Sequence, residues 1–222
     1  MSKEQKTPLA KKKILITCGP TWIPIDGTRI MSNISTGRLG QLLAKDFSNA
    51  GGAVTLLEGP VHLPIITNSK NITILKFTYY DELLESFKKL LAKRFDIVLH
   101  AAAVSDYKLK KPFKGKLQSN IENLNLELTP TKKIIHLVKK SSPKTYLVGF
   151  KLANNITHLT AKKRSKYLFD KAQCDLVVAN STNSGLGYTG YVLNRRNELL
   201  AHETSREAIS QSLLRIITEE II

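Results

Sequence analysis

Near its start the chain reads Lys13-Ile-Leu-Ile-Thr17, followed at once by Cys18-Gly-Pro-Thr21. The first run is almost continuously apolar, which is typical of a strand buried on both faces of a parallel sheet. Glycine and proline then end the strand and begin a loop. Helical spacing follows in Leu39, Leu42, Leu43 and Phe47 and stops at Gly51-Gly52. The opening therefore predicts a strand, a loop and a helix.

The same rhythm continues through most of the 222 residues. We expect strands at 53–57, 72–77, 96–100, 146–150 and 175–179, helices at 83–91, 133–139 and 160–173, and a turn-rich strand pair at 191–193 and 198–201. A capping box, Thr204-Ser-Arg-Glu207, opens the expected last helix. Apolar strands that alternate with helices predict a single α/β domain over residues 1–222, a three-layer, mostly parallel, doubly wound (Rossmann-like) sheet. Residues 1–11 are expected to be a flexible basic tail.

Composition argues against several classes of function. There is no apolar run of about 18 residues, so no membrane partner is expected. Two distant cysteines, Cys18 and Cys174, suggest a reducing cytoplasm, and five scattered histidines give no metal-ligand spacing. We expect Cys18 to be a small core residue and not a nucleophile. The net charge of +16 attracts anions, but the lysines are spread along the chain.

Two segments are too long for ordinary connections, which usually take about 2 to 6 residues. They run from Cys18 to Ser35 and from Ser105 to Asn123. Both follow the carboxyl ends of expected strands, where open α/β sheets bind their ligands. Ser35-Thr-Gly37 stands where the first helix begins, so hydroxyl caps and free amides could hold a phosphate there. Neither a P-loop nor a complete dinucleotide fingerprint is present.

A series of ordered motifs carries a family resemblance over about residues 12–222. It comprises Gly19-Pro-Thr21, Pro24-Ile-Asp26, Arg29, Ser32-Asn-Ile-Ser-Thr-Gly-Arg-Leu-Gly40, Glu58-Gly-Pro-Val-His-Leu-Pro64, Ala102-Ala-Val-Ser-Asp-Tyr107, Lys114-Gly-Lys116, Leu128-Thr-Pro-Thr-Lys132, Gly149-Phe-Lys-Leu152 and Lys171-Ala-Gln-Cys-Asp-Leu-Val-Val-Ala-Asn180. The chain resembles the phosphopantothenate–cysteine ligases (phosphopantothenoylcysteine synthetases), here in a free-standing form.

The resemblance implies a reaction. The carboxylate of 4′-phosphopantothenate attacks the α-phosphate of CTP or ATP, pyrophosphate leaves, and cysteine displaces the nucleotide from the acyl-nucleotidylate. The implied co-substrate is CTP, with ATP possible, together with Mg²⁺ and without a flavin. The family is dimeric, so a homodimer is expected, with no nucleic-acid partner and no metal ligands assigned among the side chains.

The resemblance also implies site residues. Asn33 and Lys114 correspond to catalytic residues: Asn33 holds the acyl-nucleotidylate, and Lys114 meets phosphate charge from a flap. Nucleotide contacts correspond to Gly19, Thr21, Ser35, Gly37, Ala103, Asp106, Lys114, Thr129, Lys132, Phe150 and Lys171. Substrate contacts correspond to Asn33, Arg38 and Ala102. The chain departs from the family pattern at Trp22-Ile23, Leu117 and Ser181.

Two other classes remain open. A Rossmann-type NAD(P)-binding oxidoreductase or epimerase would share the strand–helix alternation, although the glycine fingerprint is incomplete. A non-enzymatic nucleic-acid-binding module would explain the +16 charge, although it would want basic residues gathered on one element.

Lys114 gives the first prediction. It stands in Lys111-Pro-Phe-Lys-Gly-Lys116, a polar segment without apolar period, which we expect to be mobile without ligand. Surface changes usually alter stability by about 0.5 kcal/mol, whereas a lysine that meets developing phosphate charge contributes roughly a hundredfold in rate. Lys114→Gln should therefore melt like the parent and lose most nucleotidylate formation, in parallel melting and single-turnover measurements. Full activity would remove Lys114 from the mechanism.

Overall fold

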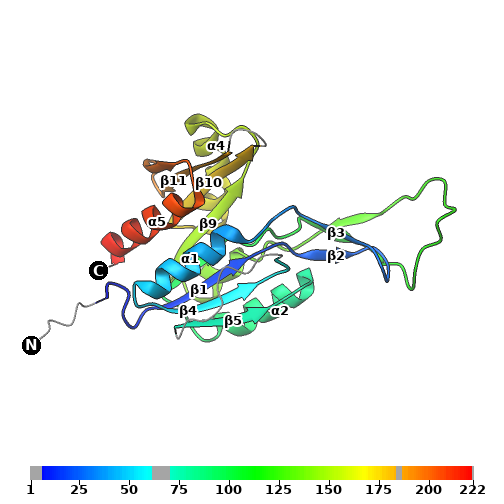
Figure 1. The fold of residues 1–222 in the computed structure, drawn as a ribbon, viewed down its shortest axis with the longest axis horizontal. Coiled ribbons are helices and arrows are strands. Elements are labelled where there is room, and N and C mark those ends of the chain that lie inside the picture. Colours follow the sequence, from blue (N-terminus) through cyan, green and yellow to red (C-terminus); the bar gives the residue numbers. More distant parts are fainter. Residues whose placement is uncertain (1–6, 62–70, 184–186, 222) are drawn as a thin grey trace, which may run out of the picture.

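The structure is a computed structural model, and it describes residues 7–61, 71–183 and 187–221. Its centre is one eight-stranded sheet (Figure 1). In chain order the strands are β1 (Lys13–Cys18), β4 (Ala53–Glu58), β5 (Ile72–Lys76), β6 (Ile97–His100), β9 (Tyr146–Leu152), β10 (Leu176–Asn183), β11 (Gly187–Asn194) and β12 (Leu199–Glu203). The end of one predicted motif, His62-Leu-Pro64, lies outside the described residues, as do residues 1–6 of the predicted tail.

The sheet is parallel over six strands in the order β10-β9-β6-β1-β4-β5, and β11 and β12 extend it antiparallel. β1 lies in the middle, where Ile14 pairs with Val54 of β4 and with Ile97 of β6. Its side chains alternate between two cores, with Ile16 on one face and Leu15 on the other. Burial on both faces explains why this strand is apolar throughout.

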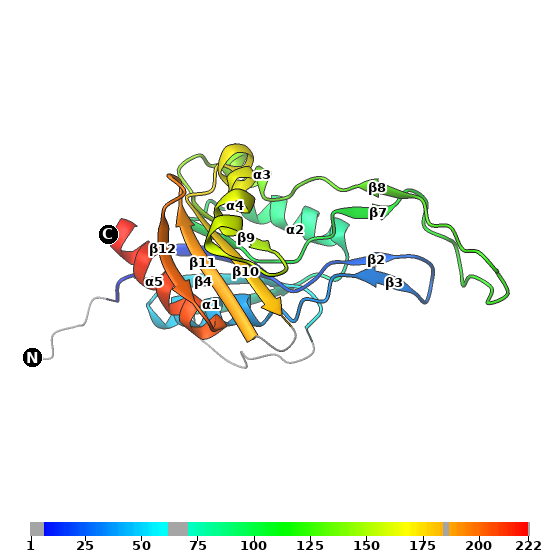
Figure 2. The ribbon, with the colours of Figure 1, turned by 90° about the horizontal axis from the view of Figure 1, so that it is seen from above.

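Helices cover both faces of the sheet (Figures 1 and 2). On one face lie α1 (Arg38–Asn49) and α5 (Arg206–Ile221), whose Phe47 and Leu213 enter the same core. On the other lie α2 (Tyr80–Leu91), α3 (His136–Ser141) and α4 (His158–Ala172), with Phe87, Val138 and Leu168 in the second core. The predicted three-layer, mostly parallel, doubly wound fold is confirmed.

Two local predictions were wrong. Residues 7–11, expected within a flexible tail, form a turn in which Leu9 is buried and its amide donates to the Ala50 carbonyl at 2.9 Å. An apolar side chain that fills the end of the core keeps this turn in place. At the last helix the cap is Ser205, whose hydroxyl accepts from the Ala208 amide at 3.0 Å, and not Thr204. α5 begins at Arg206, so the capping residue lies one position later than the box predicts.

The long loops hold short ribbons that the sequence did not predict. β2 (Trp22–Pro24) pairs with β3 (Ile30–Ser32), and β7 (Tyr107–Leu109) pairs with β8 (Leu128–Pro130), both antiparallel. β2 lies beside β7, and the two ribbons extend together away from the sheet (Figure 2). We call residues 22–32 and 107–130 the arm.

The contact between α1 and β1 gives a stability prediction. A Cβ atom added at Gly40 would lie 2.3 Å from the Cβ of Cys18. Gly40→Ala should push the helix off the strand and destabilise the fold by about 1–3 kcal/mol, a typical cost of overpacking. Lys45→Ala, at an exposed position of the same helix, is the matched control and should unfold like the parent in denaturant. Equal midpoints for all three proteins would contradict the tight packing.

Candidate active site

The site lies at the carboxyl ends of β1 and β6, which are adjacent in the sheet. The chain continues from β1 toward β4 on one side, whereas β6 leads to β9 on the other, so the strand order reverses between them. In doubly wound sheets this reversal opens a crevice where ligands bind.

Glycines let the start of α1 lie directly against the end of β1. Gly37 is the N-cap of α1 and has a φ of 71°, and a Cβ there would lie 2.6 Å from Val61 and 3.2 Å from the Gly19 nitrogen. Gly19 has a φ of 80°, and a Cβ there would lie 3.1 Å from the Gly59 backbone. Bare backbone at a helix start leaves amide groups accessible to an anion. Gly19 and Gly37, both predicted nucleotide contacts, are therefore brought together.

The predicted hydroxyl cap takes a different form. The Ser35 hydroxyl lies 3.4 Å from the Gly37 amide, the Thr36 hydroxyl lies 3.4 Å from the Arg38 amide, and no side chain caps the helix. The left-handed backbone needed for the close approach to Gly19 favours glycine at the cap. Ser35 thus flanks the helix start and supplies a hydroxyl beside it. The Arg38 side chain turns to the start of α5 and pairs with Glu207 at 2.7 Å.

Asn33 joins the loops that follow β1 and β6. Its side-chain amide donates to the Ala103 carbonyl at 3.1 Å, and the same carbonyl accepts from the Thr21 amide at 3.3 Å. In return the Ala103 amide donates to the Gly19 carbonyl at 2.9 Å. Asn33 is exposed, so its side chain borders the crevice. The sequence assigned these four residues from distant motifs, and the structure brings them together.

Thr21 is buried and joins the loops that follow β1 and β6. It is 0% exposed, and its hydroxyl accepts from the Ser105 amide at 2.9 Å. The Ser105 carbonyl accepts from the Thr131 hydroxyl at 2.6 Å, and the Thr131 amide donates to the Asp106 carbonyl at 2.9 Å. The Asp106 carboxylate is exposed and pairs with Lys133 at 2.5 Å. The Thr21–Ser105 bond holds the loop after β6 on the loop after β1, and the Thr131 bonds hold it on the residues that follow β8.

Thr17 and His100 form a buried pair next to Ala102, which was not predicted from the sequence. The Thr17 hydroxyl accepts from the Ala102 amide at 3.2 Å and lies 2.9 Å from Nδ1 of His100. Burial lowers the pKa of His100 to about 4, so the ring is neutral near pH 7 and can accept the hydroxyl proton. His100 ends an apolar strand, and a polar residue at that place is the signal that could have found it. The pair fixes the backbone of Ala102, a predicted substrate contact.

Cys18 lies beneath the junction of α1 and β1. Burial, and secondly the neighbouring Glu58 carboxylate, raise the pKa of its thiol well above the ordinary value. Glu58 itself is buried and accepts from Gln41 at 2.7 Å and from Lys76. The thiol therefore stays protonated and in the core, which agrees with the predicted core role.

Three further predicted residues border this region. Phe150 follows Gly149, which is opposite His100 in the register, and it packs partly against the core of α1 and α5. Thr129 lies in β8 opposite Lys108, at the start of the arm. Lys132 follows β8 with an exposed side chain, while its carbonyl accepts from the Tyr80 hydroxyl at 2.8 Å.

Lys171 is not brought to the site. It stands in the last turn of α4, after which the Asp175 amide donates to the Leu147 carbonyl near the start of β9. This is the edge where the strands begin, opposite to the crevice. The motif that contains Lys171 is continuous in sequence but runs from one edge of the sheet to the other, so only its end, at Ala179-Asn180, approaches the crevice.

Lys114 lies at the outer part of the arm, away from Asn33. Its segment is held on the β2–β3 hairpin, because the Phe113 amide donates to the Ile25 carbonyl at 3.0 Å and the Gly27 amide donates to the Gly115 carbonyl at 2.7 Å. The expected mobile segment is thus tied on both sides. A strand rises about 3.3 Å per residue, so the hairpin end lies roughly 13 Å from Asn33.

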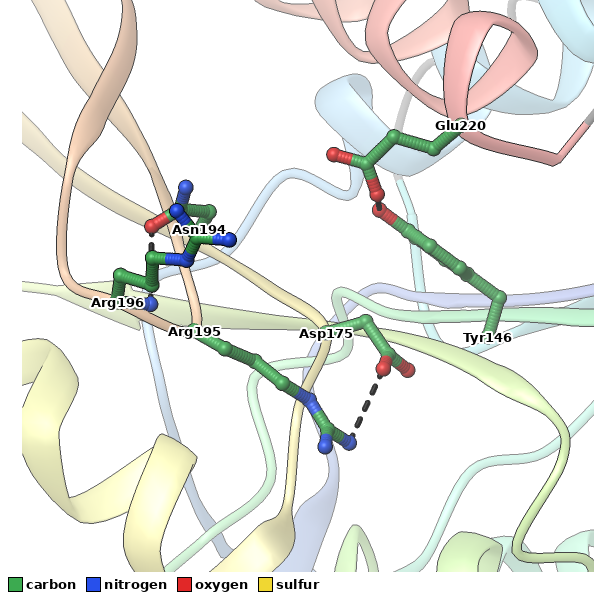
Figure 3. Close-up of a pocket in the computed structure, with 6 residues that line it drawn as sticks. All are labelled: Tyr146, Asp175, Asn194, Arg195, Arg196 and Glu220. Atoms are coloured by element: carbon green, nitrogen blue, oxygen red, sulfur yellow. Dashed lines mark hydrogen bonds and ion pairs between the residues drawn. The ribbon is translucent and has the colours of Figure 1, made fainter.

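The cavity of Figure 3 belongs to the opposite edge of the sheet. It measures about 170 Å³ and is lined by Tyr146, Asp175, Asn194, Arg195, Arg196 and Glu220. Its charged groups largely bind one another: Arg195 pairs with Asp175 at 3.0 Å, and the Tyr146 hydroxyl donates to Glu220 at 2.5 Å. No residue of the crevice lines it, so it is separate from the candidate site.

His100 gives a pH prediction. Its pKa in the folded protein, about 4, is below the value of about 6.5 in an unfolded chain. The unfolded state therefore takes up a proton first, and stability is lost as pH falls from about 6.5 toward 4. This residue alone should remove about 2 kcal/mol between pH 7 and pH 5. His100→Asn should flatten that part of the profile in urea unfolding, whereas the exposed control His202→Asn should not; equal slopes would contradict the burial argument.

The chain is similar to known proteins over most of its length. The family model of the DNA/pantothenate metabolism flavoprotein C-terminal domain matches residues 9–221. The coenzyme A biosynthesis bifunctional protein CoaBC of Thermococcus kodakarensis is 34% identical over 174 residues, which cover 78% of this chain and 42% of that protein. The DNA/pantothenate metabolism flavoprotein structure from Streptococcus pneumoniae has 28% identity and a TM-score of 0.84, covering 94% of this chain and 99% of that one.

A second similar structure is the Cab2 H337A mutant in complex with phosphopantothenate-cysteine. It has 20% identity and a TM-score of 0.73, covers 94% of this chain and 87% of that one, and so shares the fold. The chain spans about half the length of the curated relatives it matches. The family resemblance read from the ordered motifs is confirmed. The chain belongs to the DNA/pantothenate metabolism flavoprotein C-terminal domain family.

Proposed function

We propose that this chain joins 4′-phosphopantothenate to cysteine through an acyl-nucleotidylate intermediate, as a ligase of coenzyme A biosynthesis. The observation that carries the proposal is the convergence of Asn33, Ala103 and the glycine-lined start of α1 at one sheet edge. Family membership supports it, because relatives are named as coenzyme A biosynthesis proteins and the Cab2 structure holds phosphopantothenate-cysteine.

The chemistry needs positive potential and fixed donors. In the first step a substrate carboxylate oxygen bonds to the α-phosphorus, and pyrophosphate leaves with the electron pair of the broken bond. In the second the cysteine amine attacks the acyl carbon, the nucleotide leaves, and the amine loses a proton. The amides at Gly37 and the start of α1 would hold phosphate oxygens. The Asn33 amide group would donate to the acyl-phosphate oxygen, and Lys114 would neutralise phosphate charge.

A divalent ion would enter with the nucleotide. Within residues 7–61, 71–183 and 187–221, no group of three His, Cys, Asp or Glu side chains is placed to hold a metal. Mg²⁺ usually binds triphosphate oxygens and keeps several waters, with one or two protein carboxylates. Asp106 is an exposed carboxylate at this edge and fits that role. We propose CTP as the nucleotide and ATP as the alternative.

We also propose that the protein is a homodimer joined through the arm. A two-stranded ribbon is marginal alone, and the arm carries exposed apolar side chains that a second copy would cover. They are Ile30, Tyr107, Phe113, Ile121, Leu124 and Leu128, each 38–52% exposed. Such an arrangement would carry Lys114 to the crevice of the second copy, since it lies far from Asn33 of its own.

A second candidate follows from the strand order. The order β5-β4-β1-β6-β9-β10 is that of dinucleotide-binding sheets, which favours an NAD(P)-dependent enzyme. The loop from Gly19 to the start of α1 carries a hairpin where such folds have a short glycine turn. Tight binding of NADH in a fluorescence titration would support this alternative.

The proposal predicts when pyrophosphate is released. With 4′-phosphopantothenate, cysteine and Mg²⁺, we expect pyrophosphate with CTP, less with ATP, and none without the acyl substrate. Pantothenate without its phosphate is the matched control and should react at least about tenfold more slowly, because the cationic site loses an anion worth more than about 1.4 kcal/mol. Comparable rates for the two acyl substrates would refute the substrate assignment.

A further inference from the structure

A buried carboxylate lies in the otherwise exposed arm. The side chain of Asp26 is 0% exposed, although the neighbouring Gly27 and Thr28 are both exposed. Its Oδ1 atom accepts from the Thr28 amide at 2.8 Å, the Thr28 hydroxyl at 3.1 Å and the Arg29 amide at 2.7 Å. Its Oδ2 atom accepts from the Leu117 amide at 2.9 Å and from the Arg29 guanidinium. Five donors therefore converge on one carboxylate.

These donors come from two different parts of the chain. Thr28 and Arg29 belong to the turn of the β2–β3 hairpin, whereas Leu117 follows Lys114 by three residues in the loop between β7 and β8. Contacts within the turn would suffice to shape the hairpin. The Leu117 contact adds nothing to that turn and joins it to the loop instead. The Arg29 guanidinium strengthens the same junction, because it donates to the Leu117 carbonyl at 3.3 and 3.4 Å.

The charge state of Asp26 favours a permanent contact between the hairpin and the loop. The Leu117 amide is the largest influence on the pKa of Asp26 and lowers it. Burial opposes this by raising the pKa, but the amides of Thr28 and Arg29 lower it further, so the pKa lies well below its usual range. The carboxylate is thus ionised at any pH near neutrality, and hydrogen bonds to an ionised acceptor are about twice as strong as neutral ones. Neighbouring contacts of Phe113 and Gly115 with the hairpin are neutral backbone bonds.

We propose that Asp26 is a positioning residue, which clamps the segment 113–117 onto the hairpin and thereby sets where Lys114 points. The effect on catalysis rests on the proposed function. The clamp itself rests only on the hydrogen bonds of Asp26. Without the carboxylate the segment keeps the neutral backbone bonds of Phe113 and Gly115 but loses its bond to an ionised acceptor. Its Gly115, with a φ of 73° and nothing within 4 Å of its missing Cβ, leaves room for movement. Lys114 would then sample many positions, and fewer of them would meet the phosphates.

The experiment combines two substitutions and two measurements. Asp26→Asn places amide hydrogens opposite hydrogen-bond donors, and Lys114→Gln removes the cation. Single-turnover nucleotidylate formation should fall at least tenfold in Asp26→Asn. The double variant should be no slower than Lys114→Gln alone, because a clamp has nothing to position once Lys114 is gone. If the fold-loss in nucleotidylate formation of the double variant equals the product of the two single losses, the positioning role is overturned.

Limited trypsin digestion gives the readout that does not depend on catalysis. Cleavage after Lys116, followed by fragment mass, should be at least fivefold faster in Asp26→Asn than in the parent. The matched control is Asp81→Asn, which removes an exposed carboxylate that pairs with Lys108 at the start of the arm; its cleavage rate should match that of the parent. An unchanged rate in Asp26→Asn would refute the clamp.

The two readouts separate the failure of each idea. If no nucleotide supports pyrophosphate release in the parent, the proposed function fails, while faster cleavage in Asp26→Asn would still establish the clamp. If Asp26→Asn does not fold, Leu117→Pro removes the donor from the other side of the same contact. It leaves the hairpin turn intact, and cleavage is then followed after Lys114, because trypsin does not cut a Lys–Pro bond. That cleavage should be faster than in the parent; a parent-like rate would overturn the proposal.

Discussion

The structure depends on a close approach between the start of α1 and the end of β1. Gly40 lies against Cys18 and Gly37 lies against Gly19, at distances that leave no room for side chains. This contact seals the core beneath the crevice and at the same time leaves the helix amides open above it. The loops after β1 and β6 can then bond to each other through Ala103, because both leave the sheet at this sealed point.

The chain therefore has two parts that are stabilised by different interactions. The body is held by two apolar cores on the faces of the sheet, whose stability grows with the apolar area removed from water. The arm has little core of its own and is held by hydrogen bonds, of which those of Asp26 are the most concentrated. Residues expected to act together in catalysis are divided between the parts, with Asn33 on the body and Lys114 on the arm.

Most helices and strands of the body could be predicted because each follows from a local sequence pattern. Continuous apolar strands and helical spacing fix the elements, and the strand ends fix the edge where Asn33 and Ala103 meet. The ribbons could not be predicted, since strands of three residues are too short to show an alternating pattern. Leu9 was missed because a single apolar residue in a lysine-rich run carries no periodicity. Lys171 was assigned through a motif whose continuity in sequence hides the length of a strand that separates its ends.

The separation of the arm from the core also governs how this sequence can vary. Ile23 and Leu109, at the base of the arm, are buried in the second core, whereas Leu117 farther out belongs to neither core. Changes at Leu117 leave both cores intact, so selection for a folded protein scarcely acts on them, and only selection for turnover does. The outer arm can therefore change without loss of the fold, and the effect of such a change appears in turnover alone.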